Sequence, residues 1–151
     1  MNDIAIRQTI LDSVDNVYGK LEKKEIRLVV EPFTDCKLFH NRKWTVEVFV
    51  NVLENAIKYT EKGGTISISV HPYELYTEIK ISDNGRGIRQ EELTDIFKRF
   101  YRSPEVENME GSGIGLYLSN LILEREKGYI TVVSEYGKGS CFSVFLQNCK
   151  N

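Results

Sequence analysis

The sequence predicts an α+β fold, a two-layer α/β sandwich in which helices cover one face of a mostly antiparallel, mixed sheet. Two patterns predict it. Segments with apolar residues at helical spacing alternate with short β-branched segments, and turns short enough for antiparallel pairing join the later β-branched segments. The 151 residues fit one ordinary domain with its own core. We therefore expect a single domain over residues 1–151.

Composition excludes several classes of protein. The charged fraction is 28% and the formal net charge is -2, so no basic excess is available to neutralise a nucleic-acid backbone. The three cysteines, Cys36, Cys141 and Cys149, are odd in number and share no CxxC spacing, which argues against a disulfide framework or a zinc site. No window approaches the roughly 20 apolar residues of a membrane span, and the start lacks the order of a signal peptide. We expect a soluble, intracellular chain with reduced thiols.

In the first half of the chain, helical and extended patterns alternate. Residues 1–24 are expected to form a leading helix, because apolar residues recur there in steps of four and three. The segments 26–31 and 37–39 flank a Pro32–Asp35 turn and predict a hairpin. Asn41 is a candidate N-cap for a helix that runs to Tyr59. The apolar stripe of the leading helix consists of Ile6, Ile10, Val14, Val17 and Leu21.

The second half predicts more strands than helices. Segments 65–71 and 75–82 alternate apolar and polar residues and are expected to be neighbouring antiparallel strands. Residues 102–113 carry no apolar period and predict a mobile loop. The remaining expected elements are a loop at 83–88, a short helix at 90–97, a helix at 114–127, and a terminal hairpin of 129–134 and 140–146 around Gly137-Lys138-Gly139.

The helix after Asn41 has an unusual polar face. At 100° per residue, Asn51, Asn55 and Lys58 gather opposite the apolar side. Asn is a mediocre helix former, so two of them one turn apart suggest a required geometry. An amide oxygen suits Mg²⁺ shared with phosphates, Lys58 could contact those phosphates, and Tyr59 would flank the same cavity. An ordinary polar surface explains this face alone equally well.

Two glycine-rich loops follow. The first, residues 83–88, places Asp83 at a strand exit, where its carboxylate could accept a hydrogen bond from the exocyclic amine of adenine; an ordinary Asn84-Gly85 turn is the alternative. The second, residues 111–116, runs into a helix, so its amides could hold a phosphate; a flexible hinge is the alternative. The spacing of the second loop is neither that of a Walker loop nor that of a dinucleotide-binding fingerprint. Residues 97–102, between the two loops, combine aromatic side chains with cationic ones. The aromatic residues could belong to a small additional hydrophobic cluster, and the cationic residues could simply face solvent.

Together and in this order, four segments resemble the successive sequence boxes of bacterial sensor histidine kinases. The segments are 51–60, 83–87, 96–102 and 111–116, and the similarity runs from about Arg27 to Leu146. The resemblance implies the catalytic ATP-binding domain of such a kinase, with the Bergerat-type ATP-binding fold shared with gyrase-type topoisomerases and mismatch-repair ATPases. That sandwich agrees with the fold expected from the patterns above.

The resemblance also implies roles for particular residues. Asn55 resembles the magnesium ligand, Lys58 a phosphate contact, Tyr59 a wall beside adenine and Asp83 the adenine-reading carboxylate. Residues 102–113 correspond to the ATP lid. The other positions that the resemblance assigns to ATP are Gly85, Gly87, Ile88, Phe97, Tyr101, Gly111, Ser112, Gly113, Ile114, Gly115 and Leu116.

Four residues are candidates for catalysis by the same resemblance: Asn51, Glu54, Lys58 and Arg102. Arg102 resembles an arginine that reaches the terminal phosphate, and Glu54 is a possible catalytic aid. Hydrolysing relatives carry Glu where this chain has Asn51, so we expect phosphoryl transfer to a protein histidine rather than efficient attack by water.

The phosphate acceptor is expected on another domain. Neither His40 nor His71 lies in a Ser-His-Glu-like helix, and both are expected to be ordinary surface or sheet-edge residues. The resemblance implies ATP and Mg²⁺ as cofactors, a dimerisation and phosphoacceptor domain of the same kinase, and a downstream response regulator. The domain alone is expected to be monomeric, within a homodimeric and membrane-bound receptor whose cytoplasmic part it forms. The alternatives are a nucleotide-dependent partner-switching module and a hydrolytic ATPase of the same superfamily.

Overall fold

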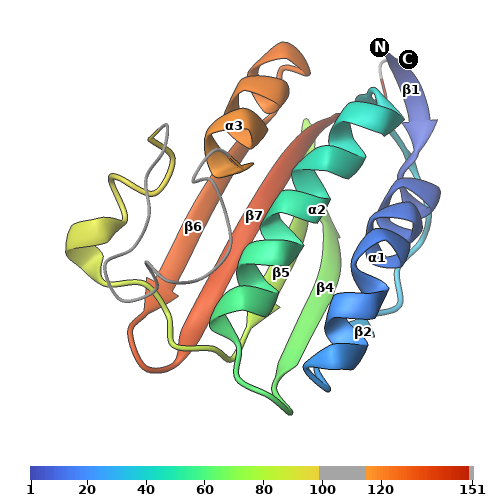
Figure 1. Cartoon of the computed structure of the whole chain (residues 1–151). Helices are drawn as coiled ribbons and strands as arrows, with labels where there is room; N and C mark the ends of the chain where they lie inside the picture. Colours follow the sequence, from blue (N-terminus) through green and yellow to red (C-terminus); the bar gives the residue numbers. More distant parts are fainter. Residues whose placement is uncertain (99–114, 150–151) are drawn as a thin grey trace.

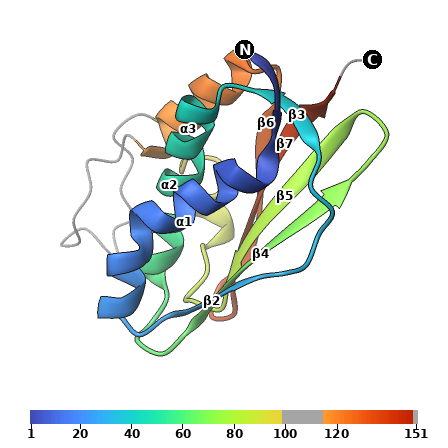
Figure 2. The same ribbon diagram turned by 90° about the vertical axis from the view of Figure 1, so that its right-hand side faces the viewer.

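The computed structural model describes residues 1–98 and 115–149, and it confirms the expected two-layer sandwich. Helices α1, α2 and α3 lie side by side on one face of the sheet (Figure 1), and the turned view separates the helical layer from the sheet (Figure 2). The described elements are β1 (Asn2–Ala5), α1 (Ile6–Lys23), β2 (Arg27–Val30), β3 (Lys37–His40), α2 (Arg42–Tyr59), β4 (Thr65–Pro72), β5 (Tyr76–Asp83), the 3₁₀ turn η1 (Gln90–Glu92), α3 (Gly115–Arg125), β6 (Tyr129–Glu135) and β7 (Gly139–Asn148).

The sheet has the strand order β1-β3-β7-β5-β4-β2, with β6 also pairing with β7. All described pairs are antiparallel except β2 with β4. The two expected antiparallel pairs are confirmed: β4 pairs with β5, with Ile68 opposite Ile81, and β6 pairs with β7, with Ile130 opposite Val144. Because β5 and β7 lie at the centre, the loop that leaves β5 at Asp83 starts from a rigid part of the molecule.

The core fills the space between the central strands and α2. Alternate residues of each strand point toward the helices, as the period of two requires. Phe49 and Leu53 of α2 are buried there, and so are Val48 and Val52. The expected N-cap is confirmed, because Asn41 Oδ1 accepts a hydrogen bond from the Trp44 backbone N–H at 3.1 Å. The buried strand residues that α2 covers include Ile66, Ile68, Ile79, Ile81, Phe142 and Val144.

The expected hairpin between segments 26–31 and 37–39 is wrong. β2 pairs with β4 in parallel, with Arg27 opposite Thr65, whereas β3 pairs with β1 and β7 near the other edge of the sheet. The segment between them is a crossing connection, not a tight turn. Four-residue strands make few hydrogen bonds, so partners distant in sequence decide where they lie.

Arg7, at the start of α1, holds that connection. Its guanidinium donates to the Phe33 carbonyl at 2.7 Å and lies 4.3 Å from the centre of the Phe33 ring. Its backbone N–H donates to Asp35 Oδ1 at 3.0 Å. Asp35 thereby caps α1, whose own N-cap residue, Ala5, makes no side-chain cap.

Two further elements differ from the expectation. The leading helix begins only at Ile6, because Asn2–Ala5 pair with β3 as strand β1. The expected helix at 90–97 is reduced to η1 followed by turns, in which the Leu93 N–H bonds to the Gln90 carbonyl and the Asp95 N–H to the Glu92 carbonyl. These bonds span three residues and not four, so the segment winds too tightly for an α-helix.

Candidate nucleotide site

The polar face of α2 carries the amide that the sequence assigned to magnesium. Asn55 Nδ2 donates to the Asn51 backbone carbonyl at 2.9 Å. This bond uses the nitrogen end of the amide, so its oxygen is the end available to a ligand. Asn55 is half-buried. A single neutral oxygen fits an ion that takes one protein ligand and completes its shell with water and phosphate oxygens.

Asn51 connects α2 to the beginning of α3. Its Nδ2 donates to the Gly115 carbonyl at 3.1 Å and to Ser119 Oγ at 3.3 Å. The Ser119 hydroxyl in turn donates to the same Gly115 carbonyl at 2.8 Å. The structure therefore brings the sequence-predicted residues Asn51 and Gly115 into contact, although 64 residues separate them.

Tyr59, at the end of α2, lies against the loop that follows β5. Its carbonyl accepts from the Arg86 backbone N–H at 3.2 Å, and the Arg86 guanidinium lies 4.7 Å from the centre of the Tyr59 ring. A Cβ atom at Gly85 would approach the Tyr59 carbonyl oxygen to 2.4 Å. Glycine is therefore required here, because the backbone of the loop packs directly on the helix end.

Asp83 is the last residue of β5, at the exit that the sequence predicted. Its Oδ1 accepts from the Gly85 backbone N–H at 2.9 Å. Burial raises the pKa of the Asp83 carboxyl, while hydrogen bonds from the backbone N–H groups of Gly85 and Ser140 lower it. A costly, partly desolvated carboxylate at a strand end is typical of a functional site.

The terminal hairpin supports this loop, a role that the sequence analysis missed. The Ile88 backbone N–H donates to Ser134 Oγ at 2.6 Å, and a Cβ at Gly87, whose φ is +75°, would come within 2.3 Å of the Glu135 carbonyl oxygen. Gly139, with φ +138°, packs so closely that a Cβ would lie 2.0 Å from the Asp83 carbonyl oxygen. The Gly137-Lys138-Gly139 sequence by itself predicts only the turn of a hairpin. In the structure, its second glycine also allows the hairpin to pack against the backbone at Asp83.

The other assigned residues take different positions. Glu54 forms an ion pair with Lys20 of α1. Ile88 belongs to the buried core, Phe97 packs edge-on against Phe142 with ring centres 6.5 Å apart, and Leu116 packs against the core. The Lys58 backbone carbonyl accepts from Lys24 Nζ at 3.1 Å. The residues that lie outside the described part of the chain are Tyr101, Arg102, Gly111, Ser112, Gly113 and Ile114, together with the rest of the expected loop at 102–113.

The two histidines differ from one another. His40 is fully buried and not on the surface, with Nε2 2.9 Å from Thr9 Oγ1 and Nδ1 2.8 Å from the Leu38 carbonyl oxygen. Burial lowers the pKa of His40. His71 is half-buried on β4, with Nε2 2.8 Å from Ser69 Oγ.

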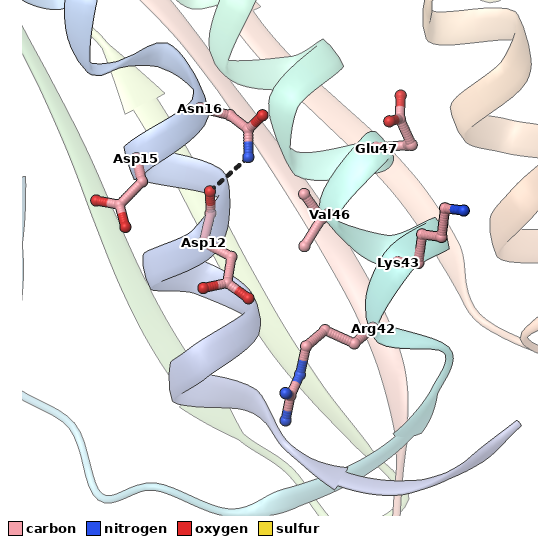
Figure 3. Close-up of a pocket in the computed structure, with 7 residues that line it drawn as sticks. All are labelled: Asp12, Asp15, Asn16, Arg42, Lys43, Val46 and Glu47. Atoms are coloured by element: carbon pink, nitrogen blue, oxygen red, sulfur yellow. Dashed lines mark hydrogen bonds between the residues drawn. The ribbon is translucent and has the colours of Figure 1, made fainter.

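A surface groove of about 560 Å³ lies elsewhere, between α1 and α2 (Figure 3). Its lining residues are Asp12, Asp15 and Asn16 of α1 and Arg42, Lys43, Val46 and Glu47 of α2. None of the residues assigned to ATP lines this groove. Within residues 1–98 and 115–149, no three acidic, His or Cys side chains cluster as a metal site would require, and no helix is long and apolar enough to cross a membrane.

Comparison with known proteins identifies the class. The sequence profile of the histidine kinase-, DNA gyrase B-, and HSP90-like ATPases matches residues 40–149, and the chain therefore belongs to this family. It is similar to the adaptive-response sensory kinase SasA of Synechococcus elongatus, with 45% identity over 142 residues, and to the sensor protein SrrB of Staphylococcus aureus, with 35% identity over 122 residues. The domain is the catalytic ATP-binding domain of a two-component sensor histidine kinase.

The relatives are much longer than this chain. The SasA match covers 93% of this chain and 37% of the relative, and the SrrB match covers 76% and 20%. Among solved structures, the mycobacterial sensor histidine kinase MprB superposes with a TM-score of 0.86 at 23% identity, covering 99% of this chain and 100% of that one. Full-length ShkA in complex with AMPPNP gives a TM-score of 0.82 at 17% identity, covering 99% of this chain and 32% of ShkA. These two likenesses show a shared fold.

Proposed function

We propose that this domain binds Mg-ATP beside the polar face of α2 and supplies the γ-phosphoryl group to a histidine on a separate dimerisation domain of the same kinase. One observation carries the proposal. Helix α2 contacts the Asp83 loop through Tyr59 and the start of α3 through Asn51. Three segments that are far apart in sequence therefore meet along the polar face of α2. Such an arrangement suits a ligand with a base at one end and phosphates at the other.

In this proposal Asp83 reads the base. Its Oδ1 is held by the Gly85 N–H, and the carboxylate accepts a hydrogen bond from the adenine amine. Guanine has a carbonyl at the corresponding position, so the same carboxylate would reject it. Tyr59, Gly85 and Gly87 form the wall and floor beside the base.

Asn55, Lys58 and the start of α3 serve the phosphates. The Asn55 amide oxygen would hold Mg²⁺, and Lys58 would add a point charge. Bound magnesium would neutralise charge on the phosphate oxygens. The backbone N–H groups and the dipole at a helix start, here that of α3, favour an anion. We further propose that Arg102 reaches the terminal phosphate, that Tyr101 contributes to nucleotide binding, and that the glycines at 111, 113 and 115 allow the chain to close on the phosphates.

Phosphoryl transfer is favoured over hydrolysis by the residue at position 51. Asn51 has no carboxylate to orient an attacking water, and its amide is bonded to Gly115 and Ser119. A hydrolytic ATPase would release phosphate from ATP with this domain alone. A partner-switching module would bind nucleotide but give no phosphohistidine when mixed with its dimerisation domain and labelled ATP.

The whole protein's partners follow from the same proposal. The relatives are about two and a half to four times as long as the chain, which leaves room for a dimerisation domain and a sensor region. We propose a homodimeric, membrane-bound receptor with this domain on the cytoplasmic side and a response regulator downstream. The domain by itself is proposed to be monomeric.

Calorimetric titration with ATP, with and without Mg²⁺, tests the proposal. We expect Asn55→Ala to abolish magnesium-assisted binding and to leave the fold intact. Asn16→Ala is a matched control, because Asn16 Nδ2 donates to the Asp12 carbonyl at 2.8 Å in the same i to i−4 geometry, in the groove of Figure 3. Absence of ATP binding by the unchanged chain would refute the proposed function, and unchanged Mg-ATP affinity in Asn55→Ala would refute the metal role.

A further inference from the structure

We propose that Asn51 is a positioning residue: it holds the first turn of α3 against α2 and acts on bound ATP through that turn, without touching magnesium or the transferred phosphoryl group. This inference rests on the proposed function above. It differs from the catalytic role that the sequence resemblance implied for Asn51.

The bonding of Asn51 is directional. Within the described part of the chain, the two hydrogen bonds of its side chain, to the Gly115 carbonyl at 3.1 Å and to Ser119 Oγ at 3.3 Å, come from the amide nitrogen. A carbonyl oxygen can only accept, so the NH₂ group must face α3. Ser119 is fully buried, and its hydroxyl donates to the same Gly115 carbonyl at 2.8 Å while its lone pairs accept from Asn51. The Asn51 amide, the Ser119 hydroxyl and the Gly115 carbonyl are thus joined by three hydrogen bonds, which use both N–H groups of the amide and the O–H of the serine.

The backbone of Gly115, in the first turn of α3, also lies close to the Asn51 side chain. A Cβ built on Gly115 would lie 3.4 Å from both Cγ and Oδ1 of Asn51. The half-buried side chain therefore lies against the helix start. The carbonyl of Asn51 meanwhile receives the amide of Asn55 at 2.9 Å. One residue thus links the proposed metal ligand to the start of α3.

The far end of the same helix pair has a separate attachment. Glu126, just after α3, is fully buried, and its Oε2 accepts from the Asn41 backbone N–H at 3.0 Å and from Thr45 Oγ1 at 2.6 Å. This attachment joins α3 to the beginning of α2, about three to four turns away from Asn55 along the helix. Glu126 therefore offers a control that loosens α2 from α3 without disturbing the end near the proposed phosphates.

Position matters at the start of α3 because the N–H groups in the first turn of a helix have no partner within the helix and point along its axis. Their attraction for phosphate depends on where the turn lies, and a displacement of about 1 Å at a reacting site can cost orders of magnitude in rate. Losing a neutral hydrogen bond of this kind is expected to change affinity by about tenfold.

The test measures ATP affinity, with and without Mg²⁺, adenosine affinity and Tm for the 151-residue chain and four variants. Asn51→Ala should weaken ATP binding about tenfold, to the same extent with and without Mg²⁺, and leave adenosine binding within about twofold. Ser119→Ala should weaken ATP binding about threefold. The double variant should be no weaker than Asn51→Ala alone, since both changes release the same turn. Glu126→Ala, which removes the acceptor for Asn41 and Thr45, should lower Tm and leave the ratio of ATP to adenosine affinity unchanged.

Three results would overturn the inference while the proposed function stands. A loss in Asn51→Ala that disappears without Mg²⁺ would indicate a metal contact. Losses that multiply in the double variant to about thirtyfold would indicate independent roles. Equal losses for ATP and adenosine, together with a lowered Tm, would indicate a general structural role. Absence of Mg-ATP binding by the unchanged chain would instead overturn the proposed function and this inference with it.

Discussion

At Asp83, the ionised carboxylate that the proposed base recognition requires lowers the stability of the ligand-free fold. Burial raises the pKa of its carboxyl above 3.8, so the ionised form is disfavoured in the folded domain relative to the unfolded chain. For an acid with a raised pKa, the folded state binds more protons, and stability falls as pH rises from about the unfolded pKa through the folded one. Near neutral pH the ionised carboxylate is therefore a cost to the ligand-free fold.

Replacing this carboxylate by its amide should separate the two effects. In Asp83→Asn the side-chain oxygen can keep the bond from the Gly85 N–H, while the NH₂ group then faces the purine amine, a donor against a donor. We expect an unchanged or slightly raised Tm by scanning calorimetry at pH 7 and at least about tenfold weaker Mg-ATP binding. Asp15→Asn on the exposed face of α1 is the matched control. Full retention of ATP affinity would exclude Asp83 from base recognition.

His40 should make the domain sensitive to mild acid. It is fully buried between Thr9 and the Leu38 carbonyl, and burial lowers its pKa below 6.5. Below that value the unfolded chain takes up the proton more readily than the folded one, so the contribution of His40 to stability is lost as pH falls. The raised pKa values of Asp83 and Glu126 act with the opposite sign at acid pH.

The contribution of His40 can be isolated by comparing the free energy of unfolding of the unchanged chain with that of a variant that lacks the imidazole. We expect the free energy of unfolding of the unchanged chain, minus that of His40→Gln, to decrease steadily from pH 7.5 to 5.5 in urea titrations. His71→Gln on β4 serves as the comparison. A difference independent of pH for His40→Gln would contradict the assignment of a neutral, buried imidazole.

Helix α2, which carries the site, is anchored at both ends by residues from other elements. At its start the backbone N–H of Asn41 bonds to buried Glu126. At its end Lys24 Nζ, from the turn after α1, donates to the carbonyls of Ile57 at 2.7 Å and Lys58 at 3.1 Å. A cation at a helix C-terminus satisfies unpaired carbonyls and the helix dipole.

Removing the Lys24 ammonium should weaken this anchor. Lys24→Met keeps most of the aliphatic stem and loses the donor, so we expect a loss of about 1 kcal/mol in the free energy of unfolding, seen as a lower denaturant midpoint with an unchanged slope. Lys23→Met, one residue earlier and exposed, should change stability by less than about 0.5 kcal/mol. Equal effects of the two substitutions would show that the contacts of Lys24 with α2 add nothing.

Elements with strong local signals were predicted correctly. Asn41 as cap, the apolar period up to Tyr59, and the short connections between β4 and β5 and between β6 and β7 all depend on residues close in sequence. The β2–β3 hairpin failed for the opposite reason. Its turn signals at Pro32 and Asp35 are real, but Arg7 holds that segment as a crossing and β2 finds its partner at Thr65.

At the scale of the whole molecule, ligand binding should stabilise the fold. The proposed site draws on α2, the loop after β5 and the start of α3, so ATP would bind the folded chain and not the unfolded one. At a concentration one hundred times Kd, Mg-ATP should add about 2.7 kcal/mol, raising Tm by about 5–10 °C. Chelating magnesium should remove most of the shift in the unchanged chain and have little further effect in Asn55→Ala. An unshifted Tm at saturating Mg-ATP would contradict a site assembled from all three segments.

Local patterns alone were sufficient for the class of fold and for the helix with its Asn face, and the resemblance of four successive motifs to a known family indicated the kind of domain. They did not reveal what Asn51 and Glu126 bond to, which strands β2 and β3 join, or that Gly139 supports the Asp83 loop. Periodicity and capping depend on neighbours within a few residues, which the chain order already supplies. A buried donor instead bonds to whichever acceptor packing brings near, here at separations of 64 and 85 residues, and only the folded chain determines that acceptor.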